Sequence, residues 1–172
     1  MPTEIEYKFL VSSDTWKQHI KQSMALKQGY LTQHDHCNSV RIRTSKSQPY
    51  SNFKIMNNAQ PAVDAFINIK RKVNTHIRHE FEYPTPLDEA DEMLSLCIGN
   101  IIEKTRYLVD YCGHTWEIDV FFGVNAGLVL AEIELESENE PFEHPDWLGK
   151  DVSDDNRYLN SSLVKYPFNQ WK

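Results

Sequence analysis

Residues 3–11 of the chain read TEIEYKFLV, and charged and apolar side chains alternate along this stretch. Side chains two residues apart share one face of a β-strand. Glu4, Glu6 and Lys8 therefore share one face, while the apolar and aromatic residues between them share the other. A half-buried strand normally turns apolar groups to the protein core. This strand is predicted to have one face made only of charge.

Six further segments alternate with the same period of two, which is the sequence signal of a β-strand. They are residues 39–44, 65–72, 77–83, 102–111, 114–121 and 128–135. An eighth strand is expected either at residues 50–56 or at residues 29–33, and the sequence does not decide between them. Many short strands with few helices predict a closed, antiparallel, eight-stranded β-barrel, because closure removes exposed edges.

Three helices are expected to flank this barrel on its outside, which makes the fold mainly β with an α+β character. The first is predicted at residues 14–27, with Trp16, Ile20 and Met24 at helical spacing after a cap at Ser13 or Asp14. The other two are predicted at residues 87–97 and 153–164.

Charged residues recur on one alternating face in all seven predicted strands. Beyond the first strand they are Arg41, Arg43, Lys70, Arg78, Glu80, Glu82, Lys104, Arg106, Glu117, Asp119, Glu132, Glu134 and Glu136. A sheet with one solvated face alternates in the same way, so no single strand decides the matter. However, all seven strands have a charged alternating face, and on some of them the charges are of one sign only. We therefore expect the charged faces to point inward and to line a tunnel.

Such a tunnel is suited to one kind of ligand. A barrel of about eight strands has room for a small molecule, and unpaired buried charges would cost more than the stability of a domain. Arg and Lys suit phosphate groups, and Glu-x-Glu pairs suit hard divalent cations. A triphosphate bridged by Mg²⁺ or Mn²⁺ would satisfy both, and phosphoryl transfer needs mainly positioning and charge neutralisation.

Length, composition and charge narrow the class of protein. The 172 residues suit one domain, with 40% hydrophobic and 25% charged residues. The net charge of −7 argues against binding to nucleic acid. No stretch has the roughly 20 apolar residues of a membrane span, and no signal peptide is recognisable. Three cysteines, an odd number, indicate reduced thiols and a cytoplasmic location.

Several of these segments together resemble a known family. In order, they are EIEYK (4–8), VRIR (40–43), the strand ending at Lys70, RHEFE (78–82), IEKTR (102–106), WEIDVF (116–121) and LVLAEIELE (128–136). Their combination is similar to the CYTH superfamily, the triphosphate tunnel metalloenzymes. The end of the chain, WLGKDVSDDNRYLNSSL (147–163), resembles the short bacterial members. The resemblance implies a single CYTH-like tunnel domain over residues 1–172.

The resemblance also implies roles for individual residues. The residues implied in catalysis are Glu4, Glu6 and Lys8. Those implied in holding the triphosphate are Lys8, Arg41, Arg43, Lys70, Arg78, Lys104, Arg106 and Arg157. The candidate ligands for Mg²⁺ or Mn²⁺ are Glu4, Glu6, Glu80, Asp119, Glu132 and Glu134. Glu82 and Glu117 would complete the acidic shell, and one of the carboxylates would act as a base.

Two features depart from the pattern of the family. Tyr7 stands where many relatives have Arg, but the alternation of side chains along the predicted strand places Tyr7 on the outward face. The segment 44–64 is longer than the usual short hairpin, which could alter the tunnel mouth or the choice of substrate.

Three functions remain open at this point. The leading one is hydrolysis of inorganic triphosphate to pyrophosphate and phosphate, because GYLTQHDHCNSVRIR (29–43) resembles tripolyphosphatases. The alternatives are a class IV adenylate cyclase that makes cyclic AMP from ATP, and a non-catalytic module that binds polyphosphate or nucleotide. The expected partner is a small-molecule triphosphate, with no nucleic acid or membrane, and the protein is expected to be a monomer or homodimer.

Overall fold

The computed structural model of the protein describes residues 3–32, 38–48, 63–74 and 76–171. Its strands are β1 (Thr3–Val11), β2 (Ile20–Tyr30), β3 (Asn38–Gln48), β4 (Val63–Lys72), β5 (Ile77–Pro84), β6 (Ile102–Tyr111), β7 (His114–Phe121), β8 (Val129–Leu135) and β9 (Leu148–Asp151). Its α-helices are α1 (Leu87–Ser95) and α2 (Asn160–Leu163), and its 3₁₀ turns are η1 (Thr15–His19), η2 (Gly123–Asn125), η3 (Asn156–Tyr158) and η4 (Phe168–Gln170).

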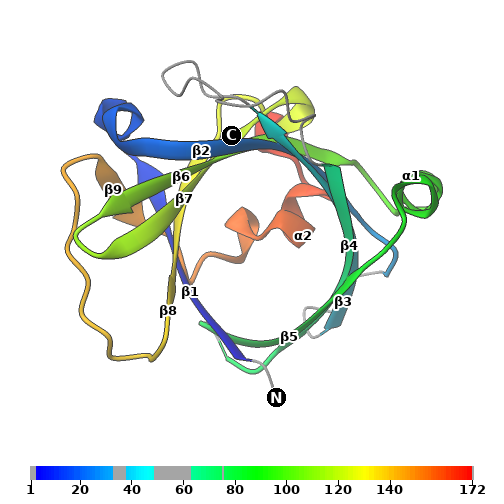
Figure 1. Cartoon of the computed structure of the whole chain (residues 1–172), viewed down its shortest axis with the longest axis horizontal. Coiled ribbons are helices and arrows are strands. Elements are labelled where there is room, and N and C mark those ends of the chain that lie inside the picture. The colour runs from blue at the N-terminus through cyan, green and yellow to red at the C-terminus, as the bar shows by residue number, and fades with distance from the viewer. Residues whose placement is uncertain (1–2, 33–37, 49–62, 75, 172) are drawn as a thin grey trace, which may run out of the picture.

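Eight of these strands close into a barrel, as predicted from the sequence. The order around the sheet is β5-β4-β3-β2-β6-β7-β8-β1, and β1 pairs back onto β5. Every neighbouring pair is antiparallel, and Figure 1 shows the ring viewed along its axis. At the seam, Glu4 lies opposite Arg78 and Ile5 lies opposite Ile77. The short ninth strand, β9, pairs with the far half of β1.

The predicted helix at residues 14–27 is wrong. Only η1 is helical there, and the rest of the segment is the long strand β2, which pairs with β3 on one side and β6 on the other. β2 is the missing eighth strand, and the candidate at 29–33 overlaps only its last two residues. The other candidate, residues 50–56, lies outside the described residues, as does 49–62 of the long segment 44–64. The backbone groups of β3 and β6 need a partner between them, and that need overrides the local helical spacing.

Helices are present in both of the other two segments predicted to be helical. α1 matches the helix expected at 87–97, and it covers the outer face of β3 and β4 through Ala90, Ile42 and Ala65. The helix expected at 153–164 is shorter and broken, with η3 followed by the single turn of α2. Its residues Leu163 and Val164 pack on apolar side chains that point into one end of the barrel, and Figure 1 shows α2 within the ring. The expectation that this helix lies outside the barrel was therefore wrong.

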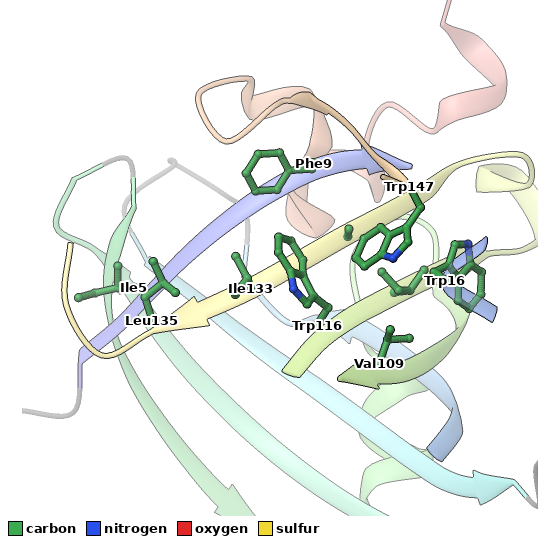
Figure 2. Packing of buried hydrophobic residues seen from close by; sticks show 10 residues of the cluster. Ile5, Phe9, Trp16, Val109, Trp116, Ile133, Leu135 and Trp147 are labelled. Carbon is green, nitrogen blue, oxygen red and sulfur yellow. The ribbon is translucent and has the colours of Figure 1, made fainter. Parts of the chain in front are cut away.

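The main hydrophobic core lies on the outside of the barrel wall. Figure 2 shows Phe9, Trp116 and Ile133, the apolar residues that alternate with the charged ones, pointing away from the lumen. Trp16 of η1 and Trp147, just before β9, cover this face and are 1% and 2% exposed. Burying side chains of this size stabilises the fold by about 1.5–3 kcal/mol each.

Tyr7 faces outward, as the alternation predicts. Its ring stacks on that of His76 with 4.4 Å between the ring centroids, and the ring of Phe142 lies 6.0 Å away. No helix in the described part of the chain is long and apolar enough to cross a membrane. Two of the three cysteines, Cys97 and Cys112, are described, and both are free thiols.

β9 holds the backbone of β1 from the side. The amide of Val152 donates to the carbonyl of Lys8 at 2.8 Å, and the amide of Lys8 donates to Ser153 Oγ at 2.9 Å. This approach needs a glycine at position 149, because a Cβ there would lie 2.8 Å from the carbonyl oxygen of Leu10.

We expect Gly149→Ala to lower the free energy of unfolding by about 1–3 kcal/mol, because the added methyl pushes β9 away from the main chain of β1. Chemical denaturation followed by circular dichroism measures this change. Lys150→Ala is the control, since it alters an exposed neighbour and is expected to change stability by less than about 0.5 kcal/mol. Equal stability of the two variants would contradict the proposed close packing.

Candidate functional site

The barrel encloses a cavity of about 620 Å³, a volume typical of small-molecule sites. Most of the residues that line it are polar or charged. Its charged residues are Glu4, Glu6, Lys8, Arg41, Arg43, Lys70, Lys72, Arg78, Glu80, Glu82, Arg106, Glu117, Glu132 and Glu134. Tyr30, Asn38, Ser39, Leu159, Asn160 and Ser161 are also in contact with it.

Strand register explains why these side chains meet. Residues directly opposite one another on neighbouring strands share a face of the sheet. The inward-facing opposite pairs include Lys8 with Glu132, Glu6 with Glu134, Glu4 with Arg78, Lys70 with Glu80, and Arg106 with Asp119. The face that the sequence predicted to be charged is therefore the face toward the lumen.

Lys8 lies at the centre of the buried charges and is 5% exposed. Its ammonium donates to Glu132 and, at 3.2 Å, to Glu6. Burial alone would lower the pKa of Lys8, but Glu132 and Glu6 outweigh it and raise that pKa above its ordinary value. Burial likewise opposes ionisation of Glu6, yet Lys8 and Arg78 hold the pKa of Glu6 well below its usual range. Both groups are therefore charged at neutral pH.

Glu4 behaves differently from Glu6, although both point into the cavity. Lys70 Nζ lies 2.8 Å from both carboxylate oxygens of Glu4 and 2.9 Å from Glu80 Oε2. Burial is the largest influence on Glu4 and, with the nearby charges of Glu6 and Glu80, raises its pKa to about 7 despite Lys70. The Glu4 carboxyl can therefore gain or lose a proton near neutral pH.

A second group of charges lies deeper in the barrel and is centred on Arg106. Its guanidinium donates to Asp119 at 2.8 and 2.6 Å, to Glu132 at 2.8 Å, and also to Glu117. Lys104 pairs with Asp119 as well, and both side chains are at most 1% exposed. Burial lowers the pKa of Lys104 to about 8 even though Asp119 opposes that change. Lys104 and Asp119 do not line the cavity; they lie behind Arg106.

Of the residues expected to contact substrate, Lys104 and Arg157 do not line the cavity, and Arg157 lies away from it on the surface. Its guanidinium is held by Asp155, with contacts of 3.0, 3.1 and 2.6 Å, and lies over the rings of Tyr158 and Trp171. The side chain is 61% exposed. It belongs to the surface of the C-terminal segment.

Among the residues that were not predicted as part of the site are Tyr30 and Lys72, which line the cavity, and Asn68, which contacts charged residues of its wall. Asn68 is completely buried and joins three charged side chains. Its amide nitrogen donates to Glu80 at 2.8 Å and to Glu82 at 2.5 Å, and its oxygen accepts from Arg41 at 3.4 Å. Asn68 and Lys72 are in phase with Lys70, so their position was readable from the alternation. Tyr30 lay beyond the predicted helix, in the undecided strand candidate at residues 29–33, so the sequence did not assign it to the lumen face.

The carboxylates have the chemistry of a site for a divalent cation. Glu6 lies directly opposite Glu134 on the lumen face, with Glu132 next to it in phase. Burial, together with neighbouring negative charge, raises the pKa values of Glu132 and Glu134. Hard oxygen donors that repel one another suit Mg²⁺ or Mn²⁺. In the structure, Glu4, Glu6 and Glu132 form ion pairs with Lys70 or Lys8. Among the described residues, no three metal-binding side chains come together in one group. Coordination would therefore require these ion pairs to rearrange.

We expect Asp119→Asn to lower the free energy of unfolding by about 3–5 kcal/mol, because it leaves Lys104 and Arg106 buried with too little negative charge. Urea denaturation at neutral pH measures the change. Asp110→Asn is the matched control, since Asp110 pairs with Lys21 on the exposed surface and should cost less than about 1 kcal/mol. A similar cost for both variants would show that the buried network contributes no special stability.

Comparison with known proteins agrees with this geometry. Residues 2–166 match the family model described as the CYTH domain. A protein from Acetivibrio thermocellus named inorganic triphosphatase is 41% identical over 173 aligned residues, which cover 100% of this chain and 99% of that protein. Another inorganic triphosphatase, from Nitrosomonas europaea, is 32% identical over 167 residues and covers 94% and 97% of the two chains.

Solved structures show the same architecture. The crystal structure of the inorganic triphosphatase NE1496 has 30% sequence identity and a TM-score of 0.62, and the match covers 95% of each chain. A putative adenylate cyclase from Bacillus halodurans, at 18% identity and a TM-score of 0.53 over 80% of this chain and 84% of that one, shares the fold alone. A closed barrel with a charged interior, a family match over nearly the whole chain and two full-length relatives lead to one conclusion: the chain belongs to the CYTH domain family.

Proposed function

We propose that this protein is a hydrolase that cleaves inorganic triphosphate into pyrophosphate and phosphate inside the barrel. The observation that carries the proposal is the cavity wall, where cations from several strands face one cavity together with carboxylates. A compact polyanion is the ligand that this wall fits. The relatives named inorganic triphosphatase, one of them 41% identical over its full length, support the same substrate.

In this proposal the substrate phosphates are held by cations that line the cavity. These are Lys8, Arg41, Arg43, Lys70, Arg78 and Arg106. Lys104 lies behind Arg106 and would act through Asp119, by fixing the orientation of the Arg106 guanidinium. Arg157 would support the C-terminal segment from outside the cavity. Lys8, protonated and buried, would neutralise charge on the phosphate that reacts.

Enzymes of this family generally depend on a divalent cation. We propose that the ligands here come from Glu4, Glu6, Glu80, Glu132 and Glu134, with Asp119 acting from behind the wall, and that the ion is Mg²⁺ or Mn²⁺. When bound, such an ion neutralises phosphate oxygens and orients the substrate. Glu4, Glu6 and Lys8 are the residues to which we assign the main part in catalysis.

We propose that residues 1–172 form one domain and that a small-molecule triphosphate is its partner. A cytoplasmic location and a monomeric or homodimeric state stay predictions. A class IV adenylate cyclase would use the same charged cavity, and no feature of this site favours it over hydrolysis. The assay below separates the two activities.

We expect purified protein with Mg²⁺ or Mn²⁺ to release phosphate and pyrophosphate rapidly from inorganic triphosphate, to use ATP poorly, and to make no cyclic AMP. Glu6→Gln should lower kcat/KM by about 100-fold or more, because it removes a carboxylate that contacts both Lys8 and Arg78. Circular dichroism checks that the variant remains folded.

Glu103→Gln is the control for this substitution. Glu103 is an exposed carboxylate on the outer face of β6, paired with Lys27 at 3.4 Å, and its loss should leave activity unchanged. Stoichiometric cyclic AMP from ATP would replace the hydrolase proposal with a cyclase. Full activity of Glu6→Gln would remove Glu6 from the catalytic group.

The pKa of Glu4 leads to a prediction about metal binding. Because that pKa is raised to about 7, Glu4 is largely protonated at pH 6 and must lose its proton to bind a cation. We expect Mn²⁺ binding to release a proton at pH 6 and much less at pH 8.5. Isothermal titration calorimetry in buffers with different ionisation enthalpies measures the release. In Glu4→Gln the difference between the two pH values should disappear, and proton release that persisted in this variant would assign it to another group.

A further inference from the structure

Lys72, the last residue of β4, differs from the other cations of the cavity. Lys8, Arg41, Arg43, Lys70, Arg78 and Arg106 each form an ion pair with a carboxylate. Within the described part of the chain, Lys72 forms none. Its only hydrogen bond there is a long one, 3.4 Å from Nζ to Asn156 Oδ1. Its ammonium can therefore receive an anion without first displacing a carboxylate.

A second cation lies directly across the sheet from Lys72. In the register of β4 and β5 the opposite residue is Arg78, so two positive side chains share the lumen face as direct neighbours. Like charges in this position destabilise a sheet. Arg78 uses one guanidinium nitrogen for Glu6, and in the described residues the others have no hydrogen bond. An anion between Lys72 and Arg78 would remove the repulsion and use these free donors.

The position of this pair defines what could bind there. β4 ends at Lys72 beside the C-terminal segment, which contributes Asn156 to Lys72 and Leu159, Asn160 and Ser161 to the cavity wall. The space at this rim is therefore bounded by protein on two sides and adjoins the cavity. A single phosphate group at the end of a longer chain suits the charge of these two side chains.

We propose that Lys72, together with the free donors of Arg78, forms a phosphate subsite at this rim that takes a terminal phosphate of inorganic triphosphate. The inference rests on the proposed function for the identity of the anion. Lys72 is then a substrate-binding residue that sets affinity for a polyphosphate end, and it takes no part in bond cleavage.

The test is the affinity for sodium tripolyphosphate, measured by isothermal titration calorimetry in EDTA, where binding is separated from metal-dependent turnover. Lys72→Gln should raise Kd by about tenfold, which corresponds to about 1.4 kcal/mol. Lys72→Arg should keep Kd within about twofold of the parent, because the charge and the hydrogen-bond donors remain. Arg71→Gln is the matched control: it removes one positive charge from the adjacent residue on the outer face, and should leave Kd unchanged.

Thermal unfolding gives a second, independent readout. Without tripolyphosphate, Lys72→Gln should unfold at the same temperature as the parent or higher, because the repulsion with Arg78 is gone. With tripolyphosphate, its gain in Tm should be smaller than that of the parent. With Mg²⁺, its KM should rise about tenfold while kcat stays within about twofold, as expected for a residue that contributes binding alone.

The subsite is overturned if Lys72→Gln binds tripolyphosphate as the parent does, or if Arg71→Gln weakens binding equally, since the effect would then be one of overall charge. It is also overturned if the parent binds no tripolyphosphate. If the parent binds tripolyphosphate but does not cleave it with Mg²⁺ or Mn²⁺, the proposed hydrolase activity fails. The tenfold ratio of Kd values then still supports the subsite, and equal Kd values overturn it.

Discussion

Charged side chains inside this barrel can stay ionised because groups of opposite charge reach them from neighbouring strands. Lys8 lies between Glu6 and Glu132, and Arg106 contacts Glu132 and Asp119. Removing an ion from water costs several kcal/mol, and only close, hydrogen-bonded pairing offsets that cost. The register of the strands must therefore be held closely, since a shift of one residue would turn every charged group to the other face.

This constraint explains why the protein has its main apolar core outside the barrel wall. Because one face of each strand is committed to charge, the other face must supply the hydrophobic stabilisation. Trp16, Trp147 and α1 provide the cover that buries that outer face. The same logic gives the C-terminal segment its role. Leu163 and Val164 pack on the apolar side chains at one end of the barrel, and the residues just before them border the cavity.

The resulting site combines strongly paired charges with a few groups that can titrate or bind a ligand. Glu4 titrates near pH 7, Glu134 is exposed to the cavity, and Lys72 is without a carboxylate partner in the described residues. A ligand that carries both negative oxygens and a divalent cation could exchange with the internal ion pairs while keeping the total charge nearly balanced. A shared fold would not by itself identify that ligand. The charged wall and the full-length relatives together support a triphosphate.

The alternation of charged and apolar residues was enough to predict most of the fold and most of the wall of the site. β1, β6 and β7 have the predicted bounds, and residues such as Arg41, Lys70 and Glu132 lie on the face that the alternation predicted to line the lumen. Three things depended on tertiary structure. β2 is a strand because β3 and β6 need a partner for their backbone groups, although its own spacing fits a helix. Lys104 and Asp119 lie behind the wall, and Arg157 lies away from it, because strand twist and packing set depth, which period-two alternation does not encode. The register between β4 and β5, which places Lys72 opposite Arg78, depended on the geometry of the turn that joins these two strands, and Lys72 has no carboxylate partner among the described residues.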